Sequence, residues 1–561
     1  MAERPRDLSL TVEAAALLVL LAVNFALRWP ALSTEGFHNE DAAGIAYNAD
    51  LLRHGLLPLR DSVETKAPGA FFAAWGVWGV FGRSLSALVW AGAWLAWLSA
   101  VALHGTARTL WGPRAGLVAA TLYTVVSPVS DSIDLNYQTW MALPWVASGW
   151  AFVAALARGR VALYVLAGAL VVLAAQVKHQ CAALGPMYAL LVIASRYVAL
   201  PDGFTPGPVG RGLAGLVGGA VLGFVPLGLW YAAHGALGDF LGTFFLSEGG
   251  WKYARSPLDL GEKLLRLGDG LLGFWEYLAL PTVLAAGALL GLRRGLRRPT
   301  LVGLLLLGLF GAGFLAAAVG FRFYKSYYLH LLPALALAAA APGNLASLLL
   351  ERTTYRWSPP GRRLQGLLVA SGVGVLLVFA AAQDAGNLRQ IRQERRFARD
   401  LDAQRVAKVV AAHSAPEDRI WVWGRWAWPV YFHADRRAAS RNYKVMNVLT
   451  TPLTNTWRRP GTPETFVADG PWREILDEVQ AARPAFVVVA PNEDRRGFKA
   501  FNEWLARDFR SVPVAGSKTL TLYARKDVQV PTAPAKPAKP KPAKPAKSAK
   551  PNAPKSSAPT P

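Results

Sequence analysis

Charged side chains gather directly after the first apolar run of the chain, in a segment that otherwise reads as one helix and a turn. Five of those within residues 37–72 are candidates for chemistry: Glu40, Asp41, Asp61, Glu64 and Lys66. Charged groups beside a bilayer core are costly and usually mark function. A carboxylate can take a proton from an acceptor, and a lysine can stabilise a departing phosphate. The segment therefore predicts group-transfer chemistry at the edge of a membrane.

The two leading acids stand at the start of a predicted helix. Its apolar residues recur at spacings of 4, 3 and 4, and the helix begins near Asn39 and ends at Gly55. The stripe consists of Ile45, Ala49, Leu52 and Leu56. Such a helix is expected to lie along the membrane surface, with Glu40 and Asp41 at the boundary of water and lipid. Capping of the helix and its dipole is the equal alternative to a catalytic role for both acids.

Lys66 lies in a short segment, Glu64 to Gly69, before the aromatic run 71–78 that is expected to re-enter the bilayer edge. An isolated lysine here would be a snorkelling anchor. Glu64 two residues earlier and Pro68 in the turn favour a phosphate-binding role instead.

Composition places these residues in a polytopic membrane protein. Of the 561 residues 53% are hydrophobic and 17% are charged, against about 25% charged in ordinary soluble domains. Several windows of about 20 residues carry almost no charge, more than a signal peptide would explain. The net charge of +24 does not indicate nucleic-acid binding, because the lysines crowd a C-terminal tail and the arginines fall in short loops.

About eleven spans are expected, and their loops give a consistent sidedness. The spans lie near 11–29, 85–105, 113–130, 139–157, 161–177, 181–200, 212–233, 271–292, 300–320, 328–349 and 364–383. With a cytoplasmic N-terminus, the arginine clusters face the cytoplasm and nearly all isolated acids face outward. The region after the last span is then extracytoplasmic. We therefore expect a membrane domain at 1–383, with its first outer loop at 30–84.

The remainder divides into a small domain and a tail. Apolar β-type runs at 419–424 and 485–490, with helical patterns at 471–482 and 497–508, predict an α/β domain over 384–527. The Pro-, Ala- and Lys-rich tail at 528–561 cannot bury a core and is expected to be disordered. The tryptophans at 421, 423, 426 and 428, with Tyr431, suit either carbohydrate stacking or a packed core; packing is the interpretation we favour.

Other outer loops hold further candidates. Lys178 and His179 could contact a donor phosphate or simply cap a helix, while Glu248 and Trp251 lie in a glycine-containing loop that could cover a substrate. The eight histidines and the lone Cys181 show no metal-ligand spacing, and one cysteine can form no internal disulfide. No cofactor is required; a divalent cation held by Glu40, Asp41 and Asp134 is conceivable but not implied.

These motifs together resemble those of the GT-C glycosyltransferases, of the protein O-mannosyltransferase and lipid A aminoarabinose transferase type (glycosyltransferase family 39-like). The resemblance covers roughly residues 10–380. It rests on Asn39-Glu40-Asp41, on Glu64-Thr65-Lys66-Ala67-Pro68-Gly69, on Ser127-Pro128 with Asp131 and Asp134, and on the run Tyr327 to Leu335. The chain departs from the family in its Glu-Asp order, which leaves either acid as the base, and in Ala67, where the family often has proline.

The resemblance implies an integral membrane enzyme with a GT-C fold. It would transfer a hexose or pentose from a polyprenyl phosphate to an extracytoplasmic lipid, glycan or protein, with inversion, in a bacterial inner membrane. The base would be Glu40 or Asp41, with Asp134 second. Lys66 would hold the leaving phosphate, oriented by Glu64. Helpers at the phosphate would be Arg322 and Lys325, and substrate would also meet Tyr327 and Tyr328.

Two functions of other classes compete with this one. A transporter or flippase of lipid-linked saccharides would usually show internal repeats and ionisable residues at the midplane, and neither is found in the sequence. A non-catalytic envelope-assembly protein tethered by its tail is the third interpretation.

Overall fold

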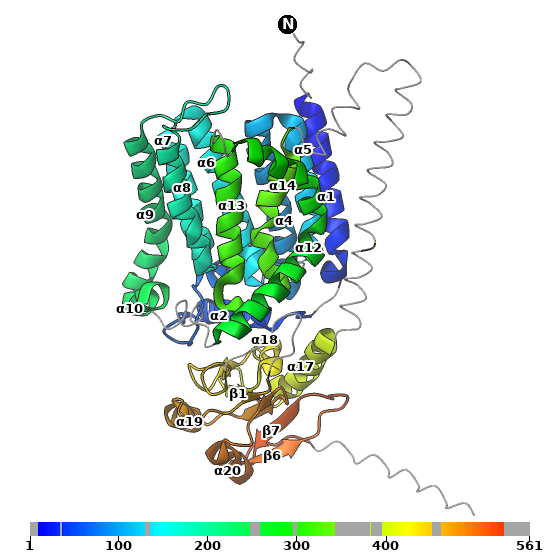
Figure 1. The fold of residues 1–561 in the computed structure, drawn as a ribbon. Coiled ribbons are helices and arrows are strands. Elements are labelled where there is room, and N and C mark those ends of the chain that lie inside the picture. Colours follow the sequence, from blue (N-terminus) through cyan, green and yellow to red (C-terminus); the bar gives the residue numbers. More distant parts are fainter. Residues whose placement is uncertain are drawn as a thin grey trace, which may run out of the picture.

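The computed structural model describes residues 9–33, 36–129, 135–246, 258–295, 300–342, 382, 395–451 and 462–531. A bundle of helices occupies one end of the molecule, and an α/β unit formed by the C-terminal part of the chain occupies the other (Figure 1). Between them lies α2 (Glu40–Arg53), which carries Glu40 and Asp41 at its start (Figure 1).

Five helices of the described residues are long and apolar enough to cross a membrane. They are α1 (Leu10–Leu32), α4 (Leu85–Trp111), α6 (Tyr137–Arg158), α9 (Val209–Ala233) and α13 (Leu301–Ala318), the last continued by η4 (Val319–Phe321). Large apolar side chains on the outside of the bundle remain exposed, among them Leu18, Val221 and Leu315 at 61%, 55% and 60%. Because a water-soluble surface rarely carries so much contiguous apolar area, this outer face is one for lipid.

Other helices fill the bundle. They are α3 (Gly69–Phe81), α5 (Pro113–Val126), η1 (Ser127–Val129), α7 (Val161–Ala175), η2 (His179–Ala183), α8 (Leu184–Ala194), α10 (Leu237–Leu241), η3 (Gly242–Leu246), α12 (Leu260–Gly295), η5 (Lys325–His330) and α14 (Leu332–Ala340). Ten of the eleven predicted spans overlap with helices of the described residues, that at 328–349 only as far as residue 340. The span predicted at 364–383 lies outside those residues, apart from residue 382.

The C-terminal unit is built on a five-stranded mixed sheet of order β2-β1-β4-β7-β6. Its strands are β1 (Arg419–Trp423), β2 (Arg437–Ala438), β4 (Phe486–Val489), β6 (Phe509–Val512) and β7 (Thr521–Arg525). Strand β1 pairs in parallel with both β2 and β4. Strand β7 pairs antiparallel with both β4 and β6. A second parallel pair joins β3 (Glu464–Thr465) to β5 (Glu493–Asp494). The helices are α17 (Arg395–Ala412), η6 (Arg425–Ala427), α18 (Pro429–Ala434), α19 (Trp472–Ala481) and α20 (Lys499–Asp508).

The inner strand β1, between β2 and β4, is buried on both faces, which explains why its sequence is a continuous apolar run. Ile420 and Val422 belong to the large core shared with the helical bundle, whereas Trp421 and Trp423 enter a second core with residues of α19 and α20. The sheet thus has one face toward the bundle and the other toward its own helices.

The helix α2 (Glu40–Arg53) forms where its apolar spacing predicted it, but its surroundings differ from the prediction. Ile45, Ala49 and Leu52 are buried, as expected; Asn48 and Asp50 on the remaining surface are buried as well. The expectation of a helix lying on the membrane surface is therefore wrong. The C-terminal unit covers the polar face, so α2 is an internal layer.

Ion pairs fasten this layer to both neighbours. The guanidinium of Arg83, between α3 and α4, donates to both carboxylate oxygens of Asp50 at 2.7 and 2.6 Å and to the carbonyl of Phe432 in α18 at 2.8 Å. Arg53 of α2 reaches Asp435, just after α18, at 3.0 Å. Arg53 and Arg83 both pair with Asp50, which satisfies this buried carboxylate.

Candidate active site

An ion pair stands where α2 meets the segment before α3. The Nζ of Lys66 lies 2.8 Å from Oδ1 of Asp41 and 3.8 Å from the centre of the Tyr137 ring. Asn39 caps the helix, because its side-chain oxygen accepts from the Asp41 amide at 2.6 Å. Asp41 therefore faces a cation at a helix N-terminus, where a carboxylate is favoured.

Two opposing effects set the proton affinity of Asp41. Burial between the two parts of the molecule would raise the pKa of this carboxyl, although 43% of the side chain is still exposed. The ammonium of Lys66, helped by Lys444 and Lys178, outweighs burial and holds the pKa below its ordinary value. Asp41 is thus ionised at neutral pH while Lys66 remains beside it.

The segment that carries Lys66 is held by its C-terminal end. Pro68 stands at the N-terminus of α3, and the amide of Gly69 donates to the carbonyl of Gln176, at the end of α7, at 2.8 Å. Ala67, where the resembled family often has proline, is completely buried. These contacts place Lys66 next to the α7–η2 turn, which contains Lys178.

The partner predicted for Lys66 is wrong. Glu64 is 1% exposed in its side chain, and it accepts from the hydroxyl of Tyr443 at 2.8 Å and the ammonium of Lys444 at 2.5 Å. Burial would raise the pKa of Glu64, but Lys444 and Lys66 together keep it below the ordinary value. Glu64 therefore joins the first outer loop to the C-terminal unit, and Asp41 orients Lys66.

Lys178 lies against the site, and His179 turns elsewhere. The Nζ of Lys178 is 3.8 Å from the centre of the Tyr327 ring, and only 8% of the residue is exposed. Burial and repulsion from Lys66 lower the pKa of Lys178 to about 7. The His179 ring instead packs against Phe244, with 5.1 Å between ring centres.

The predicted residues between α13 and α14 contact different parts of the molecule. The positive charge of Arg322 lowers the pKa of Glu464 in the C-terminal unit, although burial raises that pKa overall. Lys325 lies over the Tyr277 ring at 5.5 Å. The hydroxyl of Tyr328 donates to the carbonyl of Gly270 at 2.6 Å. In this stretch, Tyr327 contacts Lys178 through its ring.

Glu40 faces a different partner from its neighbour Asp41. Its negative charge raises the pKa of Arg425 and also that of Glu464, so it lies near both in the C-terminal unit. It also borders a small pocket between that unit and the start of α2, lined by Phe37, His38, Asn39, Glu40, Asp400, Trp426 and Pro429. The two acids thus have different neighbours: Asp41 faces Lys66, and Glu40 faces the C-terminal unit.

The aromatic cluster in the C-terminal unit is mainly core. Trp421 and Trp423 are completely buried, and Trp428 and Tyr431 are 3% and 1% exposed. Only Trp426 of this group lines the pocket beside Glu40. The packing interpretation therefore holds for these four side chains, which are not available for stacking on a sugar.

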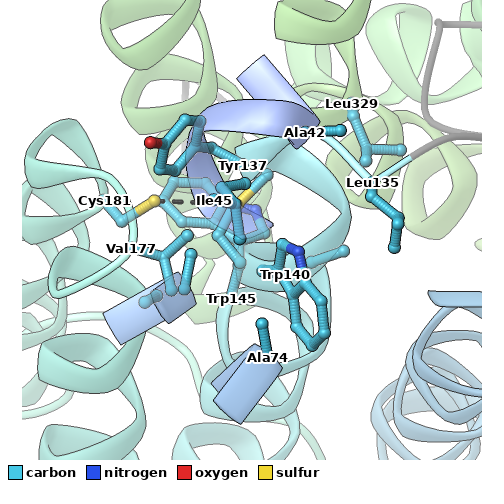
Figure 2. Close-up of a cluster of buried hydrophobic side chains, with 14 of the residues drawn as sticks. Ala42, Ile45, Ala74, Leu135, Tyr137, Trp140, Trp145, Val177, Cys181 and Leu329 are labelled. Atoms are coloured by element: carbon cyan, nitrogen blue, oxygen red, sulfur yellow. Dashed lines mark hydrogen bonds between the residues drawn. The ribbon is translucent and has the colours of Figure 1, made fainter. Parts of the chain in front are cut away.

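Beneath the charged groups lies an apolar floor. Ala42 and Ile45 of α2, Ala74 of α3 and the aromatic side chains of α6 converge there (Figure 2). The lone cysteine, Cys181, is buried in this floor, 3.7 Å from the sulfur of Met141.

Several predicted residues lie outside the described ranges. They are Asp131, Asp134, Glu248 and Trp251. Among the residues that the structure describes, no group of three His, Cys, Asp or Glu side chains could hold a metal ion.

Sequence reasoning missed Tyr443 and Lys444. They reach Glu64 from 379 and 380 residues farther along the chain. A lysine after a tyrosine in a polar domain is a common pattern, so nothing in the sequence distinguished this pair.

Comparison with known proteins bears on the family and the fold. A family model described as dolichyl-phosphate-mannose-protein mannosyltransferase matches residues 65–203. This range includes Lys66 and Lys178 and begins after Asp41. No curated protein sequence matches the chain.

Solved structures resemble nearly the whole chain at low identity. ArnT from Cupriavidus metallidurans in the apo state is 14% identical, with a TM-score of 0.56 over 91% of this chain and 98% of that one. The same protein bound to undecaprenyl phosphate is 14% identical, with a TM-score of 0.53 over 92% of this chain and 97% of that one. The oligosaccharyltransferase AglB from Archaeoglobus fulgidus was solved in complex with an inhibitory peptide and a dolichol-phosphate. It is 13% identical, with a TM-score of 0.51 over 85% of this chain and 69% of that one.

These matches confirm the resemblance to the GT-C glycosyltransferases at the level of the fold. The chain is a helical, multi-pass membrane protein with this architecture.

Proposed function

We propose that the protein transfers a sugar from a polyprenyl-phosphate donor to an acceptor outside the cytoplasm. The observation that carries the proposal is the Asp41–Lys66 pair, which lies at the end of an apolar helical bundle with Lys178 nearby. A lipid-linked donor must be met at the bilayer edge, and a carboxylate with lysines supplies both a base and a binding group for phosphate there.

In the proposed reaction Asp41 is the general base. Its carboxylate takes the proton of the acceptor hydroxyl as that oxygen attacks the anomeric carbon of the sugar. The bond from this carbon to the phosphate oxygen breaks, and the polyprenyl phosphate departs with the electron pair. Attack from the face opposite the phosphate inverts the anomeric centre. Lys66 and Lys178 stabilise the charge that develops on the leaving phosphate.

Donor binding would also activate the base. While Lys66 is paired with Asp41, the pKa of Asp41 is held low, and the carboxylate is a weak base. A phosphate group that draws the ammonium toward itself removes this influence, and burial then raises the pKa of Asp41. The base becomes effective only when a donor is present, which protects the enzyme from futile proton transfer.

The comparisons supply the lipid part of the proposal. One structural neighbour was solved with undecaprenyl phosphate and another with a dolichol-phosphate. The family model that matches residues 65–203 is named for a dolichyl-phosphate sugar donor. We accordingly propose a hexose or pentose on a polyprenyl phosphate as donor, and a lipid, glycan or protein of the cell envelope as acceptor.

The sidedness of the loops completes the proposal. The positive-inside pattern supports a cytoplasmic N-terminus. We propose a bacterial inner membrane, with the site and the C-terminal unit on its outer side. Glu40 and its pocket, which face the C-terminal unit, would then meet the acceptor, while Asp41 and Lys66 meet the donor.

The test is transfer of radiolabel from polyprenyl-phosphate sugars by the purified full-length protein. We expect wild type to remove label from the lipid, Asp41→Asn to be slower by about 10²–10⁴-fold, as for loss of a general base, and Lys66→Ala to be similarly impaired. Lys499→Ala, at an exposed lysine of α20, is the control and should retain activity. Full activity of Asp41→Asn would exclude it as the base, and label that crosses vesicle membranes without leaving the lipid would establish a flippase.

A further inference from the structure

The charges around Asp41 and Glu64 do not balance. Lys66 pairs with Asp41 at 2.8 Å and Lys444 with Glu64 at 2.5 Å, but Lys178 makes no ion pair with any residue that the structure describes. Three lysines thus stand against two carboxylates, and Lys178 is the one without a carboxylate partner among those residues. Because burial and Lys66 lower the pKa of Lys178 to about 7, an anion that enters this cluster stabilises the protonated form of that lysine.

The third lysine, Lys444, comes from the C-terminal unit and is firmly placed. The amide of Val63 donates to the carbonyl of Arg441 at 2.8 Å, so the two backbones meet beside Glu64. Tyr443 stacks on Tyr47 of α2 with 4.5 Å between ring centres. These contacts fix the backbone on which Lys444 stands, and 8% of that residue is exposed.

Lys444 can leave Glu64 without stranding that carboxylate. Glu64 also accepts from the Tyr443 hydroxyl at 2.8 Å and from the Thr65 amide at 2.8 Å. The positive charge of Lys444 is already felt at Asp41, so the ammonium lies close to the Asp41–Lys66 pair. A change of partner therefore requires rotation of one flexible side chain.

We propose that Lys444 is a ligand of the donor phosphate, contributed by the C-terminal unit, and that its ammonium turns from Glu64 to the phosphate beside Lys66 and Lys178 when the donor enters. The proposal rests on the proposed function, since it concerns the same site. A phosphodiester carries one negative charge, whereas the monoester left after transfer carries about 1.5 to 2. The additional cation matches the charge that appears as the sugar leaves.

Binding without turnover tests this role directly. The full-length protein in nanodiscs is titrated with undecaprenyl phosphate and, separately, with the neutral alcohol undecaprenol. We expect Lys444→Gln to weaken binding of the phosphate lipid about tenfold, as for loss of one charge-assisted hydrogen bond, and to leave undecaprenol binding unchanged. Lys444→Arg should recover part of the loss, and Lys499→Gln should bind like wild type. Inorganic phosphate as competitor reports whether the headgroup alone occupies the site.

Each outcome decides something. Equal weakening of both lipids by Lys444→Gln, or no weakening of either, overturns the role of Lys444 and leaves the proposed function standing. A wild type that shows no preference for the phosphate lipid overturns the proposed function itself. Should Lys444→Gln fail to fold, Glu64→Gln/Lys444→Gln is compared with Glu64→Gln, because the double variant leaves neither charge unpaired.

Discussion

Two adjacent carboxylates acquire different environments because they point to different sides of one helix turn. Asp41 meets a lysine of its own loop, while Glu40 lies near Arg425 and Glu464 of the C-terminal unit. Successive residues of an α-helix project about 100° apart, so a neighbouring pair can serve two partners. The Glu-Asp order thus directs the shorter side chain to Lys66.

A second pair of carboxylates gives a pH prediction. Glu464 and Glu493 stand opposite each other in the β3–β5 pair, and the guanidinium of Arg425 contacts Glu464. Burial and the charge of Glu464 raise the pKa of Glu493 to about 7, above the value of about 4.3 in an unfolded chain. Because the folded state holds this proton more tightly, stability is greatest below the unfolded pKa and falls as pH rises toward 7.

We expect Glu493→Gln to flatten this pH dependence. Wild type should lose roughly 3 kcal/mol of stability in the C-terminal unit between pH 4.5 and pH 7.5, since one pKa unit corresponds to about 1.4 kcal/mol. The variant should lose much less. Thermal melting across this range measures the effect, and Glu503→Gln, at an exposed position on α20, is the matched control. Parallel curves for wild type and Glu493→Gln would contradict the prediction.

Single residues were predictable where their chemistry conflicts with their position. Asp41 and Lys66 are conspicuous because charges beside an apolar run need a reason to be there. Lys444 and Tyr443 occupy a polar stretch where such residues are ordinary, and only folding brings them to Glu64. The partner of Lys66 was mispredicted for the same reason: Glu64 is near in sequence, but a distant lysine takes its hydrogen bond.

At the scale of elements, the close approach of α3 and α7 sets the distance between Lys66 and Lys178. A Cβ added at Gly69 would lie 2.7 Å from the carbonyl oxygen of Gln176, which is backbone and cannot move aside cheaply. Lys66 precedes this contact by three residues and Lys178 follows it by two. The glycine thus allows the two lysines to share one site.

Gly69→Ala should therefore separate the two lysines. We expect transfer to slow by about 100-fold, the effect of a displacement near 1 Å in a reacting site, while the helical bundle stays folded. The assay is release of label from the lipid donor, with melting in detergent as the check on folding. Gly76→Ala, on the same helix with open space around it, should stay close to wild type. Equal activities of the two variants would show that the α3–α7 contact does not position the lysines.

The helices and strands were easier to predict from the sequence than the segments that pack against them. Apolar periodicity located α2 and β1, because each pattern depends only on local spacing and burial. The same pattern mispredicted where α2 lies. Its polar face, with Asn48 and Asp50, looked suited to water, but Tyr443 and Arg83 supply the partners that water would have given.

At the scale of the whole molecule, α2 joins the helical bundle, whose outer face suits lipid, to the C-terminal α/β unit. One face packs on the bundle and the other on the C-terminal unit, through the Tyr47–Tyr443 stack and the Arg53–Asp435 pair. Motion of the C-terminal unit away from the bundle would remove Tyr443 and Lys444 from Glu64 at the same time.

Hydrogen exchange can detect this dependence. Amides of α2 should exchange slowly in wild type, and Tyr443→Ala should accelerate them by about 100-fold, because loss of a buried aromatic side chain costs about 3 kcal/mol or more. Amides of α6 should not change. Tyr523→Ala, at a partly buried tyrosine of β7 that packs against the second core with residues of α19 and α20, is the control. Unchanged exchange in α2 after Tyr443→Ala would mean that the two parts do not depend on this contact.

The two-sided burial of α2 also has a consequence for how the protein is made. Residues 40–53 leave the ribosome more than 300 residues before 437–444, the segment that covers their polar face. Since chains fold from the N-terminus during synthesis, the first loop must wait, half covered, while the bundle is inserted. The site closes only when the last domain has been translated. A chain truncated before that point would carry Asp41 and Lys66 in the membrane but not an assembled site.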